Sequence, residues 1–253
     1  MTLGLPSDRP AFAHERPRMK GCLIALGILV GLVVLVVGFW NLNFYDVHVR
    51  YRLTVEVQDG DQIKTGSSVI DAPYGMQPDW SPSGPGALLR FVGYAPTVDL
   101  GEKGMLFLTF EDVPRTPNSI RARNSQFFCA SDDMWCLPFA AYGEPGTGVA
   151  TGVGPAFSKQ KAALTELLRK SGPRDVSFVV LPRLGRFLNI NDPLTLVPVS
   201  PYDLAASFGP GVELKRVILQ LTDDPVTRPP EIWPQWLKEK GQMRGKLRGY
   251  QND

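Results

Sequence analysis

The sequence predicts an α+β protein, with one transmembrane helix near the N-terminus followed by a single β-rich domain that has one or two short helices. Three observations lead to this prediction. A long uncharged apolar run lies near the start of the chain, segments of alternating apolar and polar residues recur after it, and only one later stretch has clear helical periodicity. The 25 glycines and 23 prolines indicate many turns between short elements.

Residues 21–40 contain no charged side chain and consist mostly of Leu, Val, Ile, Gly and Ala. A helix of this length rises about 30 Å, which matches the hydrocarbon thickness of a bilayer and exceeds the usual apolar run of a buried helix. A cleaved signal peptide is the closer alternative, but its apolar core is usually shorter and is followed by small residues at the cleavage site. This run ends in Phe39 and Trp40. Such aromatics are typical of the membrane interface, so we expect an uncleaved anchor.

The flanking charges predict the orientation of this helix. Three cations lie within residues 16–20, whereas the first cation after the helix is Arg50. Because Lys and Arg are retained on the cytoplasmic side, we expect residues 1–20 to form a cytoplasmic tail. Residues 41–253 are then expected on the far side of the membrane.

Gly27 and Gly31 form a G-x-x-x-G pair inside the predicted membrane helix. Glycines at this spacing let two helices approach closely, although glycine is common in membrane helices in any case. The pair therefore identifies the face through which the helix would pack in a homodimer.

The charges balance outside the anchor region. Residues 1–40 carry four basic and two acidic side chains, and the rest of the chain carries 23 of each. Binding to phosphates requires a surplus of Lys and Arg on one face, and this balance gives no indication of one. We expect the lipid bilayer and an envelope component as partners, and no nucleic acid.

The predicted extracytoplasmic domain spans residues 45–227. Apolar and polar residues alternate over 49–58, and residues 62–70 return after Asp59-Gly60 as the second strand of a hairpin. A long loop is expected at 72–86 because it is rich in Pro and Gly. Further strands are expected at 88–94, 105–110, 176–181, 194–199 and 216–222.

Two helices and a tail complete the prediction. Residues 159–170 carry helical periodicity after the capping residue Ser158. A short helix is expected to begin at Ser200-Pro201 and to reach about Phe208. Residues 228–253 hold six basic and three acidic side chains and predict a basic, largely disordered tail. Two tryptophans in this tail are expected to dock on the domain or on a partner: Trp233 and Trp236.

Cys129 and Cys136 both lie on the predicted far side of the membrane. In an oxidising compartment two thiols so close in sequence are expected to form a disulfide, which would stabilise the fold by about 2–3 kcal/mol. Two free buried thiols are the alternative, and the spacing does not match the C-x-x-C of redox pairs. The far-side segment also lacks an N-x-[ST] sequon, which mildly favours a bacterial periplasm over a secretory lumen.

Catalytic, metal and cofactor signatures are weak throughout. The chain has two histidines, His14 in the predicted cytoplasmic tail and the juxtamembrane His48. A catalytic triad needs a histidine inside the folded site, and zinc sites usually use histidines or several cysteines, so we expect neither. The paired acids Asp132-Asp133 and Asp223-Asp224 are the one feature that could support hydrolysis or a calcium site, but adjacent aspartates most often shape turns. The glycines before residue 159 lack a phosphate-binding pattern. We expect no catalytic residue, metal or cofactor.

Several segments resemble a group of uncharacterised proteobacterial proteins that carry an N-terminal apolar segment. The resemblance covers about half of the predicted domain. It implies a bacterial source and an envelope location, and it implies no activity. The segments are Arg50–Val57 (RYRLTVEV), Lys64–Ile70 (KTGSSVI), Asn191–Thr195 (NDPLT), Asp203–Val212 (DLAASFGPGV) and Leu221–Thr227 (LTDDPVT).

Two functions follow from these observations. The first is a non-enzymatic binding or structural module, tethered to the inner membrane and facing the periplasm, with recognition carried by aromatic loops. The second is a carboxylate-dependent hydrolase acting on an envelope substrate, which rests on the acid pairs alone. The loop aromatics are Tyr74, Trp80, Tyr94, Trp135 and Tyr142, and packing of these rings in the core is the alternative interpretation.

Overall fold

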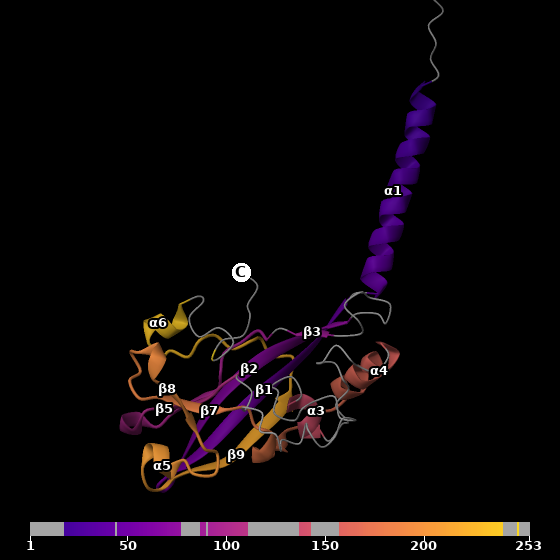
Figure 1. Ribbon diagram of the computed structural model, residues 1–253. Coiled ribbons are helices and arrows are strands. Elements are labelled where there is room, and N and C mark those ends of the chain that lie inside the picture. The colour runs from indigo at the N-terminus through magenta and orange to yellow at the C-terminus, as the bar shows by residue number, and fades with distance from the viewer. Residues whose placement is uncertain are drawn as a thin grey trace, which may run out of the picture. The chain divides into compact units, whose positions relative to one another are not determined.

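The computed structural model describes residues 18–43, 45–76, 87–89, 91–110, 137–142, 157–239 and 247. The chain divides into two compact units, Met1–Asn43 and Phe44–Asp253. The first contains a single described helix, and the second contains two antiparallel β-sheets with a few short helices (Figure 1). The predicted α+β class, β-rich after an N-terminal apolar helix, is confirmed.

The helix α1 spans Arg18–Asn43 and contains the 18-residue apolar stretch Leu23–Trp40. That stretch rises about 27 Å, and none of it is buried within the chain. Its leucine, isoleucine and valine side chains are all more than half exposed. A helix that is apolar on every side needs an apolar surrounding to bury it. Among the described residues, α1 is the one helix long and apolar enough to cross a membrane.

The larger sheet has the strand order β3-β2-β1-β9-β6, and all of its neighbours are antiparallel. The hairpin predicted from the alternation is present, with Tyr51 opposite Ile70 in its register. Alternate residues of β1 from Val49 to Val57 are buried, which places one face of this long strand in the core. The bounds are β1 Tyr45–Asp59, β2 Gln62–Met76, β3 Ala87–Leu89, β6 Arg174–Val176 and β9 Val212–Leu221.

The smaller sheet has the strand order β4-β5-β7-β8 and packs against β2 of the larger one. The two sheets approach so closely that a Cβ on Gly66 of β2 would lie 2.0 Å from the backbone oxygen of Thr97 in β4. Glycine is therefore required at this crossing. The bounds are β4 Thr97–Asp99, β5 Met105–Leu108, β7 Leu184–Phe187 and β8 Leu196–Val199.

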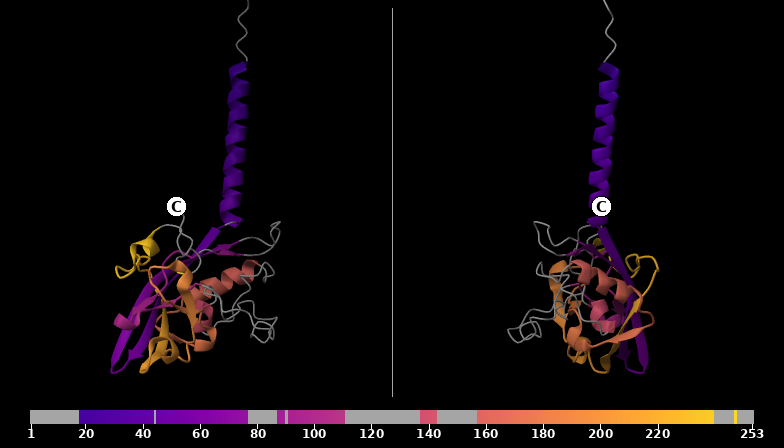
Figure 2. Two further views of the ribbon diagram at one scale, coloured as in Figure 1. Left: turned by 60° about the vertical axis from the view of Figure 1, so that its left-hand side comes forward. Right: turned by 90° about the vertical axis from the view of Figure 1, so that its right-hand side faces the viewer.

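Short helices surround the sheets. In Figures 1 and 2, α3 and α4 lie together on one side of the domain, and β8 and α6 lie on the opposite side. The α-helices are α3 Leu137–Tyr142, α4 Phe157–Leu168, α5 Ala205–Phe208 and α6 Gln235–Lys238. The 3₁₀ helices are η1 Gly101–Lys103, η2 Phe178–Val180 and η3 Pro193–Thr195.

Two apolar clusters form the core. The larger one is built from β1, β2, β9 and the elements that cover them, and the smaller one contains Phe107, Phe187 and Trp233. Trp233 is 2% exposed, and its ring lies 5.9 Å from that of Phe107. The nearby Trp236 ring packs edge-on against Phe187, and its indole nitrogen donates to the backbone oxygen of Ile190.

This packing corrects the predicted disordered tail. Residues 228–239 are part of the domain. The free energy gained by burying the indole of Trp233 and by forming α6 outweighs the cost of ordering this charged segment. Leu247 is buried in the same cluster, and its backbone oxygen accepts a hydrogen bond from Ala95. The prediction that the two tryptophans dock on the domain is confirmed.

Several predicted elements differ in their limits. The loop expected at 72–86 is strand as far as Met76, because β1 pairs with β2 along its whole length, and 77–86 lie outside the described residues. The strand expected at 176–181 ends at Val176 and continues as η2, since Ser177 accepts a hydrogen bond from the backbone of Val179. The short helix expected from Ser200 is a turn, followed by α5.

Candidate functional site

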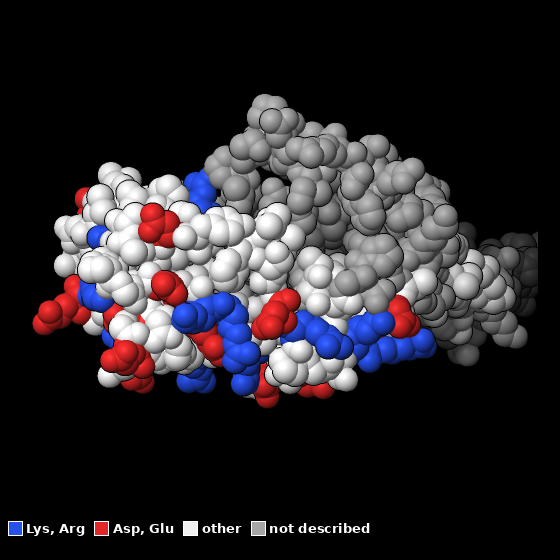
Figure 3. All heavy atoms as spheres, turned by 90° about the horizontal axis from the view of Figure 1, so that it is seen from below, with Lys and Arg blue, Asp and Glu red and all other residues white. Residues whose placement is uncertain are grey.

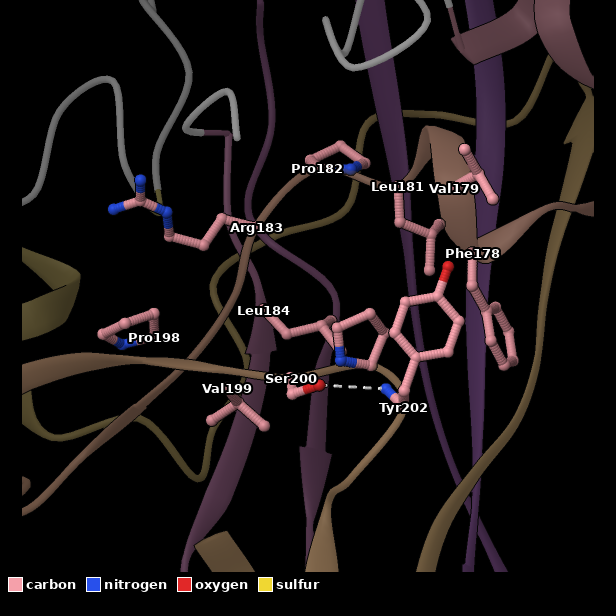
Figure 4. Close-up of a pocket in the computed structure, with 11 residues that line it drawn as sticks. Phe178, Val179, Leu181, Pro182, Arg183, Leu184, Pro198, Val199, Ser200 and Tyr202 are labelled. Atoms are coloured by element: carbon pink, nitrogen blue, oxygen red, sulfur yellow. Dashed lines mark hydrogen bonds between the residues drawn. The ribbon is translucent and has the colours of Figure 1, made fainter. Parts of the chain in front are cut away.

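An open apolar groove of about 690 Å³ lies beside the edge strand β8. Two stretches of chain line it, one running from η2 into β7 and the other from β8 into the turn before α5. Figure 4 shows these side chains around the ring of Tyr202. The residues are Phe178, Val179, Leu181, Pro182, Arg183, Leu184, Pro198, Val199, Ser200, Pro201 and Tyr202.

The floor of the groove belongs to the core, and its rim is exposed. Leu181 and Leu184 are 2% and 1% exposed, so they hold the floor in place. On the rim, Tyr202 is 69% exposed and Val179 is 58% exposed. The rings of Phe178 and Tyr202 meet nearly edge to face, with their centroids 6.2 Å apart. Val179 and Tyr202 are therefore the large apolar side chains of the groove lining that are exposed to solvent.

Local hydrogen bonds shape both walls. Ser177 accepts from the backbone of Val179 and begins η2, which presents the valine side chain to solvent. In the opposite wall, Ser200 accepts from the backbone nitrogen of Tyr202 at 3.3 Å (Figure 4). The nitrogen of Asp203 donates to the backbone oxygen of Ser200 at 3.2 Å. Each wall of the groove is therefore a hydrogen-bonded turn. One turn presents the side chain of Val179 and the other presents that of Tyr202.

Prolines remove backbone donors from this groove. Pro182, Pro198 and Pro201 all line it, and none of them has an N–H. Pro198 is exposed on the edge strand β8, which therefore offers no N–H at this position. A ligand in the groove meets a strand edge with fewer backbone donors than a regular one.

A smaller polar pocket of about 350 Å³ adjoins the groove. Phe178, Pro201 and Tyr202 line both spaces, so the two aromatic rings form the wall between them. Asp203 and Glu213 bring carboxylates to the polar pocket. Asp203 accepts from the backbone nitrogen of Ala206 at 3.0 Å. Glu213 forms an ion pair of 3.2 Å with Lys215, and its side chain is 67% exposed.

The aspartate pair that supported the hydrolase alternative is engaged in structural contacts. Asp224 lies 2.6 Å from the guanidinium of Arg52 and also accepts from the hydroxyl of Thr222. The backbone oxygen of Asp223 accepts from Arg50. These contacts fix the chain as it leaves β9. Asp132 and Asp133 lie outside the described residues.

His48 is a surface residue with a structural partner. Its ring nitrogen Nδ1 lies 3.0 Å from a carboxylate oxygen of Asp71, whose side chain is 10% exposed. Arg50 lies 3.6 Å from the same oxygen. The β1–β2 register places Arg50 directly opposite Asp71, so the contact follows from strand pairing. No group of three metal-ligating side chains occurs among the described residues.

The titratable groups whose pKa values are shifted lie in the core or make contacts that hold the fold together. Burial raises the pKa of both Tyr51 and Tyr74, so these phenols stay neutral and lie in the core. Hydrogen bonds from Lys103 and then Lys64 lower the pKa of Asp59. These contacts tie the β1–β2 turn to η1. Neither these three groups nor Arg216, the fourth with a shifted pKa, lines the groove.

Charges of both signs alternate on the face seen in Figure 3. Two of the ion pairs on the sheet are Arg216 with Glu56 at 2.7 Å and Arg52 with Asp224 at 2.6 Å. The Glu56 carboxylate also raises the pKa of Arg216. This interspersed pattern gives a solvated surface without a patch of one sign on that face.

The loop aromatics predicted to carry recognition are mostly structural. Tyr74 and Tyr94 are 1% and 6% exposed. The hydroxyl of Tyr142 donates to the backbone oxygen of Gly172 and accepts from the nitrogen of Leu221. Trp80 and Trp135 lie outside the described residues. Tyr202 was predicted to lie in a short helix and was not among the predicted site residues. Its position between Pro201 and Asp203 is nevertheless typical of an exposed turn.

The remaining predicted site residues stay predictions. Cys129 and Cys136 lie outside the described residues, so the structure does not test their disulfide. Gly27 and Gly31 lie on α1, where an added Cβ would meet no atom of this chain within 4 Å. A second helix would therefore meet an open surface there. Comparison of the chain with protein-family models, with curated proteins and with solved structures gave no match.

Proposed function

We propose that this protein is a membrane-tethered binding module that recognises another protein through the groove beside β8. The observation that supports this function is the exposed apolar rim, in which Tyr202 and Val179 stand over a buried floor. Leaving such side chains in water is unfavourable, and covering them is worth about 25 cal/mol per Å² of apolar surface. Rigid walls also reduce the entropy lost when a ligand is bound.

The location forms part of the same proposal. The helix α1 anchors the protein in the inner membrane, the cations before it hold the N-terminus in the cytoplasm, and the domain faces the periplasm. Phe44 alone separates the end of α1 from the start of β1. Because α1 tethers the domain, we expect its partners among the components of the envelope.

Site-specific photo-crosslinking in living cells tests this function. A photoreactive phenylalanine analogue replaces Val179 on the rim, or Ile63 on β2 as the control. Ile63 is a matched position because it is apolar and 51% exposed but does not line the groove. We expect a discrete crosslinked product from position 179 that is absent from position 63. Identical patterns from the two positions would contradict binding through the groove.

A second variant separates binding from folding. Tyr202→Ala removes the most exposed ring of the groove, and because that side chain is 69% exposed, the free energy of unfolding should change by no more than about 0.5 kcal/mol. The crosslink from position 179 should then disappear while the melting temperature stays the same. A crosslink that persists in this variant would show that the rim does not form the contact.

A further inference from the structure

We infer that the ligand of the groove is an extended, proline-containing protein segment that carries a Lys or Arg next to its apolar residues. This inference rests on the proposed function and names the chemistry of the partner. The apolar groove would hold the proline and aliphatic side chains, and the adjoining acidic pocket would hold the cation. The relevant observation is that Phe178, Pro201 and Tyr202 belong to both spaces.

The lining of the groove favours a polyproline II conformation in the ligand. A strand added to a sheet needs backbone donors and acceptors along the edge. Pro198 removes one donor from the four-residue edge strand β8, and Pro182 and Pro201 remove donors from the chain segments that flank it in the groove. A polyproline II segment needs no such partners, because its backbone stays solvated while its side chains bind between aromatic rings. The rings of Phe178 and Tyr202, inclined at 67° with their centroids 6.2 Å apart, provide a ridge of this kind.

The charge of the polar pocket favours a cation at one end of the ligand. Asp203 and Glu213 both line this pocket, and its lining includes no Lys or Arg; Glu213 also forms an ion pair of 3.2 Å with Lys215, which does not line the pocket. In Figure 4, Arg183 points away from the ring of Tyr202, so it leaves the ridge free of positive charge. The two carboxylates would repel the phosphate of an anionic lipid and attract a basic side chain.

Peptide display against the full-length protein tests this inference. The protein is held in nanodiscs made of phosphatidylcholine, and random twelve-residue peptides are selected for binding. We expect enriched peptides that combine Pro and aliphatic residues with a Lys or Arg at one end. The dissociation constant of one selected peptide is then measured by fluorescence anisotropy, together with that of the same peptide in which the basic residue is Gln.

Two variants assign the contacts. Tyr202→Ala should weaken binding of both peptides about 30-fold or more, as expected for the loss of a central aromatic. The double variant Asp203→Asn with Glu213→Gln should weaken only the basic peptide, by about fivefold, because these carboxylates are exposed and screened. Asparagine keeps the oxygen that accepts from the backbone of Ala206, so the turn before α5 is retained.

A matched control isolates the pocket from net charge. Asp99→Asn with Glu102→Gln removes the same two charges, and Asp99 likewise accepts a backbone hydrogen bond, from Gly101 at 2.8 Å. Neither residue lines the groove or the pocket, so the basic peptide should bind this variant as it binds the natural chain.

The outcomes distinguish this inference from the proposed function. If no peptide is enriched while the crosslink from position 179 still forms, this inference is overturned and binding of a protein through the groove stands. If the enriched peptides lack a cation, or the double variant binds both peptides equally well, binding through the groove stands and the acidic pocket does not select the ligand. If the basic peptide binds in phosphatidylcholine nanodiscs but is displaced by phosphatidylethanolamine, a lipid amine occupies the pocket, and a protein segment is not its ligand.

Discussion

The indole nitrogen of Trp233 donates a hydrogen bond of 3.0 Å to the hydroxyl oxygen of Thr97, and both side chains are buried. The hydroxyl of Thr97 in turn donates to the backbone oxygen of Ala95 at 3.1 Å. The two residues are 136 positions apart in the chain. This hydrogen bond therefore fixes the segment after β9 onto the smaller sheet. Both buried polar groups, the indole N–H and the hydroxyl, have hydrogen-bond partners.

Replacing Thr97 with Val should destabilise the domain by about 1–3 kcal/mol, because the buried indole N–H would lose its acceptor. The measurement is the free energy of unfolding of the full-length protein in detergent by chemical denaturation. Removing residues 228–253 should cost more, since it also uncovers Phe107 and Phe187. A truncated protein as stable as the full chain would show that the segment does not contribute to the core.

Replacing Gly66 with Ala should destabilise the domain by more than the ~1–3 kcal/mol typical of overpacking. The added Cβ would lie 2.0 Å from the backbone oxygen of Thr97, and backbone cannot move aside as a side chain can. Gly185→Ala is the graded control, because its Cβ would first meet the flexible end of Leu196 at 3.1 Å. We expect a much lower melting temperature for Gly66→Ala than for Gly185→Ala. Equal losses would contradict the tight crossing of the two sheets.

Elements with strong local patterns could be predicted from the sequence. The β1–β2 hairpin follows from alternation and a turn at Gly60, whose φ of 59° suits glycine. The helix α4 follows from the apolar periodicity of residues 159–170 and the Gly-Pro stop after it, although it begins at Phe157, so that the predicted cap Ser158 lies inside the helix. In both cases the local signal agrees with the packing that the element finds.

Elements that depend on distant partners could not be predicted. The strand β4 is three residues long, and β7 contains Gly185, which lowers its strand propensity. Both form because they pair with β5, which is a tertiary effect. The apolar run after Val176 reads as strand, yet the side chain of Ser177 turns it into η2. The groove is lined in part by η2 and β7, so its location could not be predicted from the sequence either.

The contribution of Asp59 to stability should depend on pH. Hydrogen bonds from Lys103 and then Lys64 hold its pKa below the ordinary value of 3.8. Because the folded-state pKa is lower than the unfolded one, the contribution is fully present above about pH 3.8 and is lost as the pH falls through that value toward the folded-state pKa. Asp59→Asn should therefore lower the melting temperature at pH 7, and by less at pH 3, where part of the contribution has been lost.

The control for this titration is Asp61→Asn, an exposed position in the same turn. Its melting temperature should follow that of the natural chain at every pH. If the difference between the natural chain and Asp59→Asn stayed constant down to pH 3, the ion pairs of Asp59 with the two lysines would not be the cause of its stabilising effect.

The orientation of the anchor gives the last prediction. Three cations precede α1 within residues 16–20, and the next one is Arg50, so the membrane potential and the positive-inside rule favour a cytoplasmic N-terminus. A phosphatase reporter that folds only outside the cytoplasm should be active when fused after Asp253 and inactive when fused after residue 17. A fluorescent protein that matures only in the cytoplasm should give the reverse result at Asp253. Fluorescence there would reverse the orientation and place the groove in the cytoplasm, where its partners would have to be of a different kind.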